Sequence, residues 1–177
     1  MKLTNNLFAL LIALTALLLT GCNKNKGNND GDNADYAAAI AGTYTGDCKL
    51  KDEIIASGVE VNIEGVDNKK VTLKITQDLN IMGMKIPLKD VSSSDCEVTS
   101  GGNKYSVKGE IKVNVTNVPN PLNPEQTMDV LPLILTITGD IVGDAATLTF
   151  NPALDNGIAP IPLGDVIGTV QFTGTKK

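Results

Sequence analysis

Apolar and polar residues alternate along most of the chain that follows Gly42. Between Tyr105 and Thr116 the odd positions are Tyr, Val, Gly, Ile, Val and Val, and the even positions are Ser, Lys, Glu, Lys, Asn and Thr. A strand places successive side chains on opposite faces, so this segment predicts a half-buried antiparallel strand. The same period of two recurs in residues 44–51, 59–64, 70–76, 131–137, 146–150 and 166–172.

These segments predict an all-β domain of about eight strands with no long helix. Turn-forming residues separate several of them, at Asp67-Asn68, Gly101-Gly102-Asn103 and Gly143-Asp144. If consecutive strands pair in one sheet, closure into an antiparallel up-and-down β-barrel removes the exposed edges. We therefore expect a barrel, with the sandwich as the other architecture of many short strands.

One predicted strand changes phase. Leu79 and Ile81 occupy odd positions, whereas Met84 and Ile86 occupy even ones. A glycine bulge at Met82-Gly83 would allow one continuous strand to make this switch.

The N-terminus carries a targeting signal. The apolar run from Leu7 to Leu19 is thirteen residues long, whereas a membrane-spanning helix needs about 20, so a secretory signal peptide is expected. Leu19-Thr20-Gly21-Cys22 resembles the lipobox of bacterial lipoproteins. The resemblance implies that residues 1–21 are removed and that the thiol of Cys22 receives a diacylglycerol. The alternative is an ordinary cleaved signal with a chance cysteine.

The resemblance to lipoproteins also implies a location. We expect a cell-envelope protein whose partner is the membrane, reached through Cys22, with the outer membrane as the expected site and its face left open. Residues 22–35 then form a flexible tether, because Asn23–Asp35 (NKNKGNNDGDNAD) has no large apolar residue. Its aspartates do not match a calcium loop, since Ala34 and Ala41 stand where ligands are required. The remaining residues, 36–177, are expected to form one domain.

Residues 40–175 resemble the calycin-like β-barrel domain of bacterial cell-envelope lipoproteins, which is related to the lipocalins. The similarity is carried by Gly42-Thr43-Tyr44-Thr45-Gly46, by LNIMGMKIPLKDV at residues 79–91, by LILTITGDIVGDAATLTF at residues 133–150 and by the closing segment 168–174. Lipocalins begin with Gly-x-Trp, where this chain has Tyr44, and they have a late arginine that is missing here. The resemblance implies a barrel and a cavity, and no ligand identity.

Composition argues against several function classes. The chain has no His and no Arg, so it lacks an imidazole base, histidine metal ligands and guanidinium clamps. A net charge of −5 and a pI near 4.7 argue against nucleic-acid binding. Ser106 and Lys108 share a strand face with Glu110 and Lys112, which indicates a solvated surface. We expect no catalytic residues, metal or cofactor.

Cys48 and Cys96 remain once Cys22 is assigned to lipid. Both lie on the inward phase of their strands, and an oxidising compartment would allow a disulfide. The closed loop of about fifty residues would contribute roughly 4 kcal/mol in the chain-entropy model. Two buried free thiols are the alternative.

The inward set is apolar and uncharged. A cavity inside the barrel would suit a small hydrophobic ligand, although side chains fill the interior of many small barrels. The sequence thus leaves two function hypotheses: carriage of a hydrophobic ligand inside, or a protein- or glycan-interaction module with a filled core. The predicted lining residues are Tyr44, Tyr105, Ile111, Leu133, Leu135, Phe150 and Phe172.

Two proline-rich segments, Asn117–Asp129 and Asn151–Asp165, are expected to be long loops. Their apolar residues either pack across an end of the barrel or belong to stiff surface connections. The residues concerned are Leu122, Met128, Leu154, Ile158 and Ile161.

Overall fold

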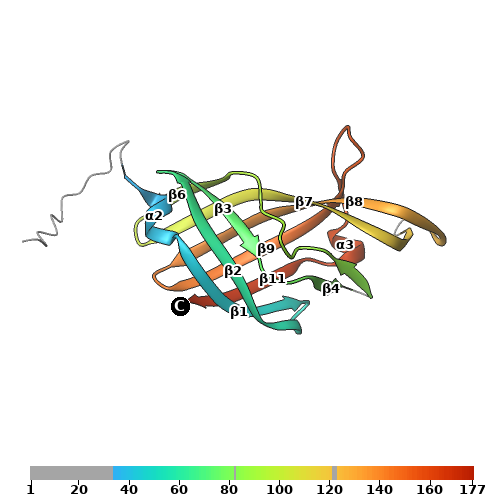
Figure 1. The fold of residues 1–177 in the computed structure, drawn as a ribbon, viewed down its shortest axis with the longest axis horizontal. Coiled ribbons are helices and arrows are strands. Elements are labelled where there is room, and N and C mark those ends of the chain that lie inside the picture. The colour runs from blue at the N-terminus through green and yellow to red at the C-terminus, as the bar shows by residue number, and fades with distance from the viewer. Residues whose placement is uncertain (1–33, 82, 121–122) are drawn as a thin grey trace, which may run out of the picture. The chain divides into compact units, whose positions relative to one another are not determined.

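The alternating segments close into one barrel in the computed structural model, which describes residues 34–81, 83–120 and 123–177 (Figure 1). In this part of the chain eight strands form the ring, each hydrogen-bonded to the next along the chain, and the last pairs with the first. The predicted up-and-down antiparallel barrel is therefore confirmed. The ring strands are β1 (Gly42–Leu50), β2 (Glu53–Asp67), β3 (Lys70–Ile75), β6 (Cys96–Gly101), β7 (Lys104–Asn120), β8 (Asn123–Val142), β9 (Ala145–Leu154) and β11 (Val170–Lys176).

Closure is made by β1 and β11, which pair from Tyr44↔Lys176 to Leu50↔Val170. Two glycines face each other in this ladder, Gly46 and Gly174. A Cβ on Gly46 would lie 2.0 Å from the carbonyl oxygen of Thr173, so only glycine permits the close approach with which the sheet bends shut.

The strands β7 and β8 extend past their neighbours, at the opposite side of Figure 1 from the short helix α2 (Tyr36–Ile40). The predicted loop Asn117–Asp129 is therefore wrong, because β7 continues to Asn120 and β8 begins at Asn123. Val118 pairs with Met128. Pro119 and Pro124 lie beyond the segments of β7 and β8 that pair with β6 and β9, where a missing N–H is tolerated.

The predicted bulge at Met82-Gly83 is also wrong. Two short strands, β4 (Leu79–Ile81) and β5 (Met84–Ile86), pair with each other as a separate hairpin. Gly83 has a φ of 82°, which suits a turn. A turn reverses the chain, so the apolar residues on both sides of it reach the same face although their parity differs.

The second proline-rich segment is only in part a loop. β9 runs to Leu154, and after an exposed turn the chain forms β10 (Ile161–Pro162) and α3 (Gly164–Ile167). Ile158 is 95% exposed and does not pack across the barrel. Leu163 and Ile167 are buried instead, at 0% and 2% exposure. Among the described residues, no helix is long and apolar enough to cross a membrane.

Candidate functional site

The barrel interior is the first place to look for a site. Six of the seven predicted lining residues are buried, with exposures of 0–4%. Tyr105 is half-buried, and its ring centroid lies 6.0 Å from that of Tyr36, at an angle of 51°. The six buried residues are Tyr44, Ile111, Leu133, Leu135, Phe150 and Phe172.

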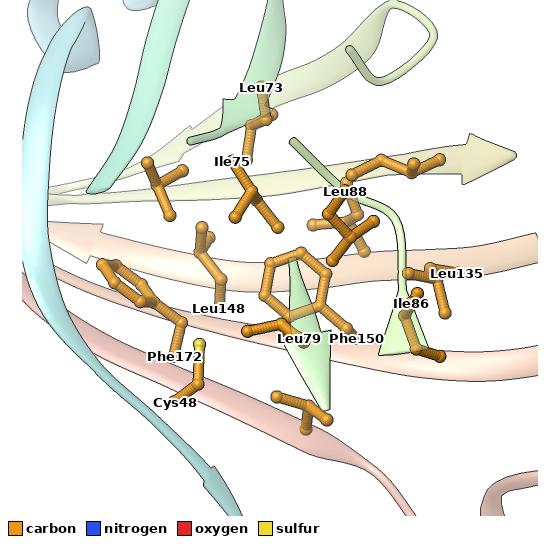
Figure 2. Close-up of a cluster of buried hydrophobic side chains, with 14 of the residues drawn as sticks. Cys48, Leu73, Ile75, Leu79, Ile86, Leu88, Leu135, Leu148, Phe150 and Phe172 are labelled. Carbon is orange, nitrogen blue, oxygen red and sulfur yellow. The ribbon is translucent and has the colours of Figure 1, made fainter. Parts of the chain in front are cut away.

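Side chains fill this interior. Tyr44, Ile111 and Phe172 are 0% exposed, so no water-sized void lies against them. Figure 2 shows the rings of Phe150 and Phe172 among aliphatic side chains. A void of about 10 Å³ lies between the β4–β5 hairpin and the barrel wall, whereas ligand pockets measure about 300–1,000 Å³. Of the two alternatives that the sequence left open, the described interior has the filled core.

The end of the barrel beside α2 is closed by a buried hydrogen bond. The Tyr44 hydroxyl donates to the carbonyl oxygen of Ile40 at 2.9 Å, and Ala37 and Ile40 of α2 are buried. Burial, followed by the Asp144 carboxylate, raises the pKa of Tyr44. Asp35 caps α2 by accepting from the backbone N–H of Ala38. The helix therefore acts as a plug held by both apolar contacts and a specific hydrogen bond.

The β4–β5 hairpin covers the core elsewhere. Leu79, Ile86 and Leu88 are 0–2% exposed and lie beside Leu135 and Phe150 in Figure 2. Asp78 holds the two ends of this excursion together, since its carboxylate accepts from the backbone N–H of Lys89 at 3.0 Å and pairs with Lys85 at 3.0 Å. These interactions, the first of them most, lower the pKa of Asp78.

The disulfide predicted between Cys48 and Cys96 is not formed in this structure, where both thiols are free and buried. Cys48 lies on β1 and Cys96 begins β6, with β2 and β3 between them in the sheet. The Cys96 thiol donates to the hydroxyl of Ser93 at 3.3 Å. Burial raises the pKa of both thiols, for Cys48 to about 12.

A concavity of about 500 Å³ lies on the outer wall of the barrel, across β6, β7, β8 and β9. Cross-strand pairing arranges its polar residues in two rows of four. One row runs Glu97, Lys108, Thr138 and Thr149, and the other runs Thr99, Ser106, Asp140 and Thr147. Strand spacing makes this grid about 14 Å by about 7 Å. We call it the outer groove.

Val107 and Gly139 form the floor of the outer groove, between the two rows. Both positions have the inward phase. A Cβ on Gly139 would lie 2.3 Å from the carbonyl oxygen of Thr147. The missing side chain therefore lets β8 lie close to β9 at this point.

One carboxylate in the outer groove is fixed in place. The Ser106 hydroxyl donates to Asp140 at 2.7 Å, and the Lys104 ammonium pairs with the same carboxylate at 3.2 Å. The two interactions, Ser106 first, lower the pKa of Asp140, so this group stays an ionised acceptor. Within the described residues, the hydroxyls of Thr138, Thr147 and Thr149 have no hydrogen-bond partner in the protein.

The sequence prediction missed this groove. Ser106 and Lys108 were assigned to a solvated face, and their face is indeed the outer one. The available signal was the recurrence of threonine on the outward phase of successive strands, but parity alone does not show whether an outer face is hollowed. Among the described residues, no group of three potential metal-binding side chains comes together.

The lipobox and Cys22 lie outside the described residues. No family model matches the chain, and neither a curated protein nor a solved structure matches it significantly. The structure therefore defines a class by its fold alone: an eight-stranded antiparallel β-barrel, compatible with the calycin-like fold, whose core is filled where the chain is described.

Proposed function

We propose that the protein is a lipid-anchored, non-enzymatic binding protein of the cell envelope that recognises its partner with the outside of the barrel. The observation that carries this proposal is the contrast between the two sides of the wall. The inside is packed with apolar side chains at 0–6% exposure, and the outside has a concavity of about 500 Å³. A ligand can enter the second without any rearrangement.

The anchor is supported by the lipobox at Leu19–Cys22, and its resemblance to bacterial signals favours the outer membrane. Several acyl chains on one residue give stable anchoring, where a single chain is marginal. Metabolic labelling with a fatty-acid analogue should mark the wild-type protein and spare Cys22→Ser. Equal labelling of the two would refute the anchor.

Lipid analysis can distinguish recognition by the outside of the barrel from binding of a ligand inside it. Protein purified from its native membrane is extracted and its lipids are measured by mass spectrometry. We expect only the acyl chains attached to Cys22, because the described core has no room for a further chain. A lipid present at one molecule per protein and released without cleavage of a covalent bond would refute recognition by the exterior.

Carriage of a hydrophobic ligand remains the second candidate, and the β4–β5 hairpin is the observation that favours it. This hairpin is a sheet of its own that covers the apolar core through side chains such as Leu79 and Ile86. Its displacement would open an apolar mouth. A fluorescent fatty acid that binds at one site per protein would support this function, and the calycin resemblance agrees with it.

A further inference from the structure

The outer groove has the chemistry of a site for a neutral, polyhydroxylated ligand. A threonine hydroxyl both donates and accepts a hydrogen bond, as a sugar hydroxyl does. The groove presents such hydroxyls on neighbouring strands at Thr99, Thr138, Thr147 and Thr149, together with the fixed carboxylate acceptor of Asp140.

The charges around the groove favour a neutral ligand over an ionic one. Glu97 and Lys108 are cross-strand partners, and Asp140 is paired with Lys104. Two carboxylates are thus balanced by two ammonium groups. The groove therefore has no excess positive charge that would attract a phosphate or a polyanion. Donors and acceptors are both present, which matches a ligand that offers both.

The position of the groove disfavours an extended peptide. Peptides add to sheets at edges, through free backbone groups. Here the floor is the face of a paired sheet, since β6–β7, β7–β8 and β8–β9 are all in register across the groove. Of the described residues that line the groove, Val107 is the one large apolar side chain, and it is 2% exposed. Peptide side chains would therefore find no apolar pocket to anchor them.

The size of the groove sets the length of the ligand. A concavity of about 500 Å³ lies within the range of small-ligand pockets, and the grid of about 14 Å by about 7 Å is long and narrow. We propose that the outer groove binds a short neutral segment of a glycan, laid across β6 to β9. This inference rests on the proposed function, and names the ligand class of its exterior surface.

The affinity should be modest. No aromatic ring of the described residues lines the outer groove, so stacking contributes nothing and hydrogen bonds to water must be exchanged for hydrogen bonds to protein. Each such exchange has a small net effect. We expect dissociation constants in the millimolar range, as for a site that works by repetition along a polymer.

The test uses the full chain in lipid nanodiscs and ligand-observed saturation-transfer NMR, with empty nanodiscs as the blank. The probes are maltohexaose, cellohexaose and chitohexaose, with oligogalacturonate as an anionic control. We expect saturation transfer to at least one neutral hexaose and none to oligogalacturonate. The variant Thr138→Val/Thr149→Val should bind about tenfold more weakly, because it removes two hydrogen-bonding hydroxyls and keeps the side-chain shape.

The matched control is Thr116→Val/Thr175→Val, which removes two exposed hydroxyls that neither line the groove nor pair with a residue that lines it. It should bind as the wild type does. Equal weakening by both double variants, or none by either, would overturn the assignment to the groove. The assignment to a neutral glycan would be overturned if no neutral hexaose showed saturation transfer. It would also be overturned if a neutral extended peptide showed saturation transfer that weakened in the Thr138→Val/Thr149→Val variant. Neither result bears on the lipid analysis above, which decides separately between the exterior and the interior.

Discussion

The close contact between Gly109 and Cys96 gives a quantitative test of the packed interior. A Cβ on Gly109 would lie 2.1 Å from the sulfur of Cys96 and 2.8 Å from its Cβ. Overpacking a core typically costs about 1–3 kcal/mol, and the depth of this overlap places Gly109→Ala near the upper value. At roughly 3 °C per kcal/mol for a domain of this size, the Tm should fall by about 9 °C.

A double-mutant cycle identifies the sulfur as the obstacle. Cys96→Ala alone removes one buried atom and should cost about 1 kcal/mol. In that background Gly109→Ala meets the Cβ at 2.8 Å and the Cα at 3.0 Å but no sulfur, and its cost should fall to about 1 kcal/mol. The double variant is then less destabilised than the sum of the single variants by about 2 kcal/mol, within the usual range for residues in contact.

The assay is urea denaturation followed by circular dichroism, with Gly101→Ala as the matched control. Gly101 also lies in a strand, and a Cβ there would meet nothing within 4 Å. Its substitution should change the free energy of unfolding by less than about 0.5 kcal/mol. Additivity of Gly109→Ala and Cys96→Ala within about 0.5 kcal/mol would refute the close contact.

Three further predictions concern buried groups. At pH 8 a thiol reagent should leave Cys48 and Cys96 unmodified in the native protein. After unfolding in the absence of reductant it should modify both thiols. No reaction after unfolding would indicate a disulfide. The raised pKa of Cys48, about 12, favours the protonated thiol in the folded state, so its contribution to stability is complete below the unfolded pKa near 9 and is lost as the pH rises toward 12. Relative to Cys48→Ala, the wild type should therefore lose stability over this pH window, by at most about 1.4 kcal/mol per pH unit. Parallel curves of stability against pH for the two proteins would contradict the assignment. Tyr44→Phe should lower the free energy of unfolding by about 1–3 kcal/mol, because the carbonyl of Ile40 loses its donor. Amide hydrogen exchange in α2 should then become faster. Unchanged exchange in α2 would argue against its role as a plug.

The alternation of residues predicted the all-β class, and it favoured the barrel with the sandwich as the other architecture. Segments such as Tyr105–Thr116 show which face is apolar, and a chain of consecutive strands with one apolar face removes its edges by closing. Inward positions were therefore identified correctly for Tyr44, Ile111 and Phe172, which are all 0% exposed. Whether a residue stands at an odd or an even position is a local property of the sequence. It shows which face of a strand is apolar, and the apolar face is the one that becomes buried.

The local sequence pattern gave wrong predictions for segments whose structure depends on which strand they pair with. The phase change near Gly83 is compatible with a bulge or with a hairpin, and only the pairing of Leu79 with Ile86 distinguishes them. The proline-rich segment after Asn117 was assigned to a loop because proline lacks an N–H. The structure pairs Val118 with Met128, beyond the neighbouring strands, where that donor is not needed.

The sequence by itself predicted the all-β class and one apolar face for each strand, and residues 19–22 resemble a lipobox. Tertiary structure decided whether the barrel is hollow, because the space left inside depends on how far opposite walls approach. At Gly109 and Gly139 a missing side chain lets the wall come within contact distance of its neighbours. How side chains from different strands fill the interior, and where the outer wall is hollowed, cannot be obtained from the alternation of residues along one strand.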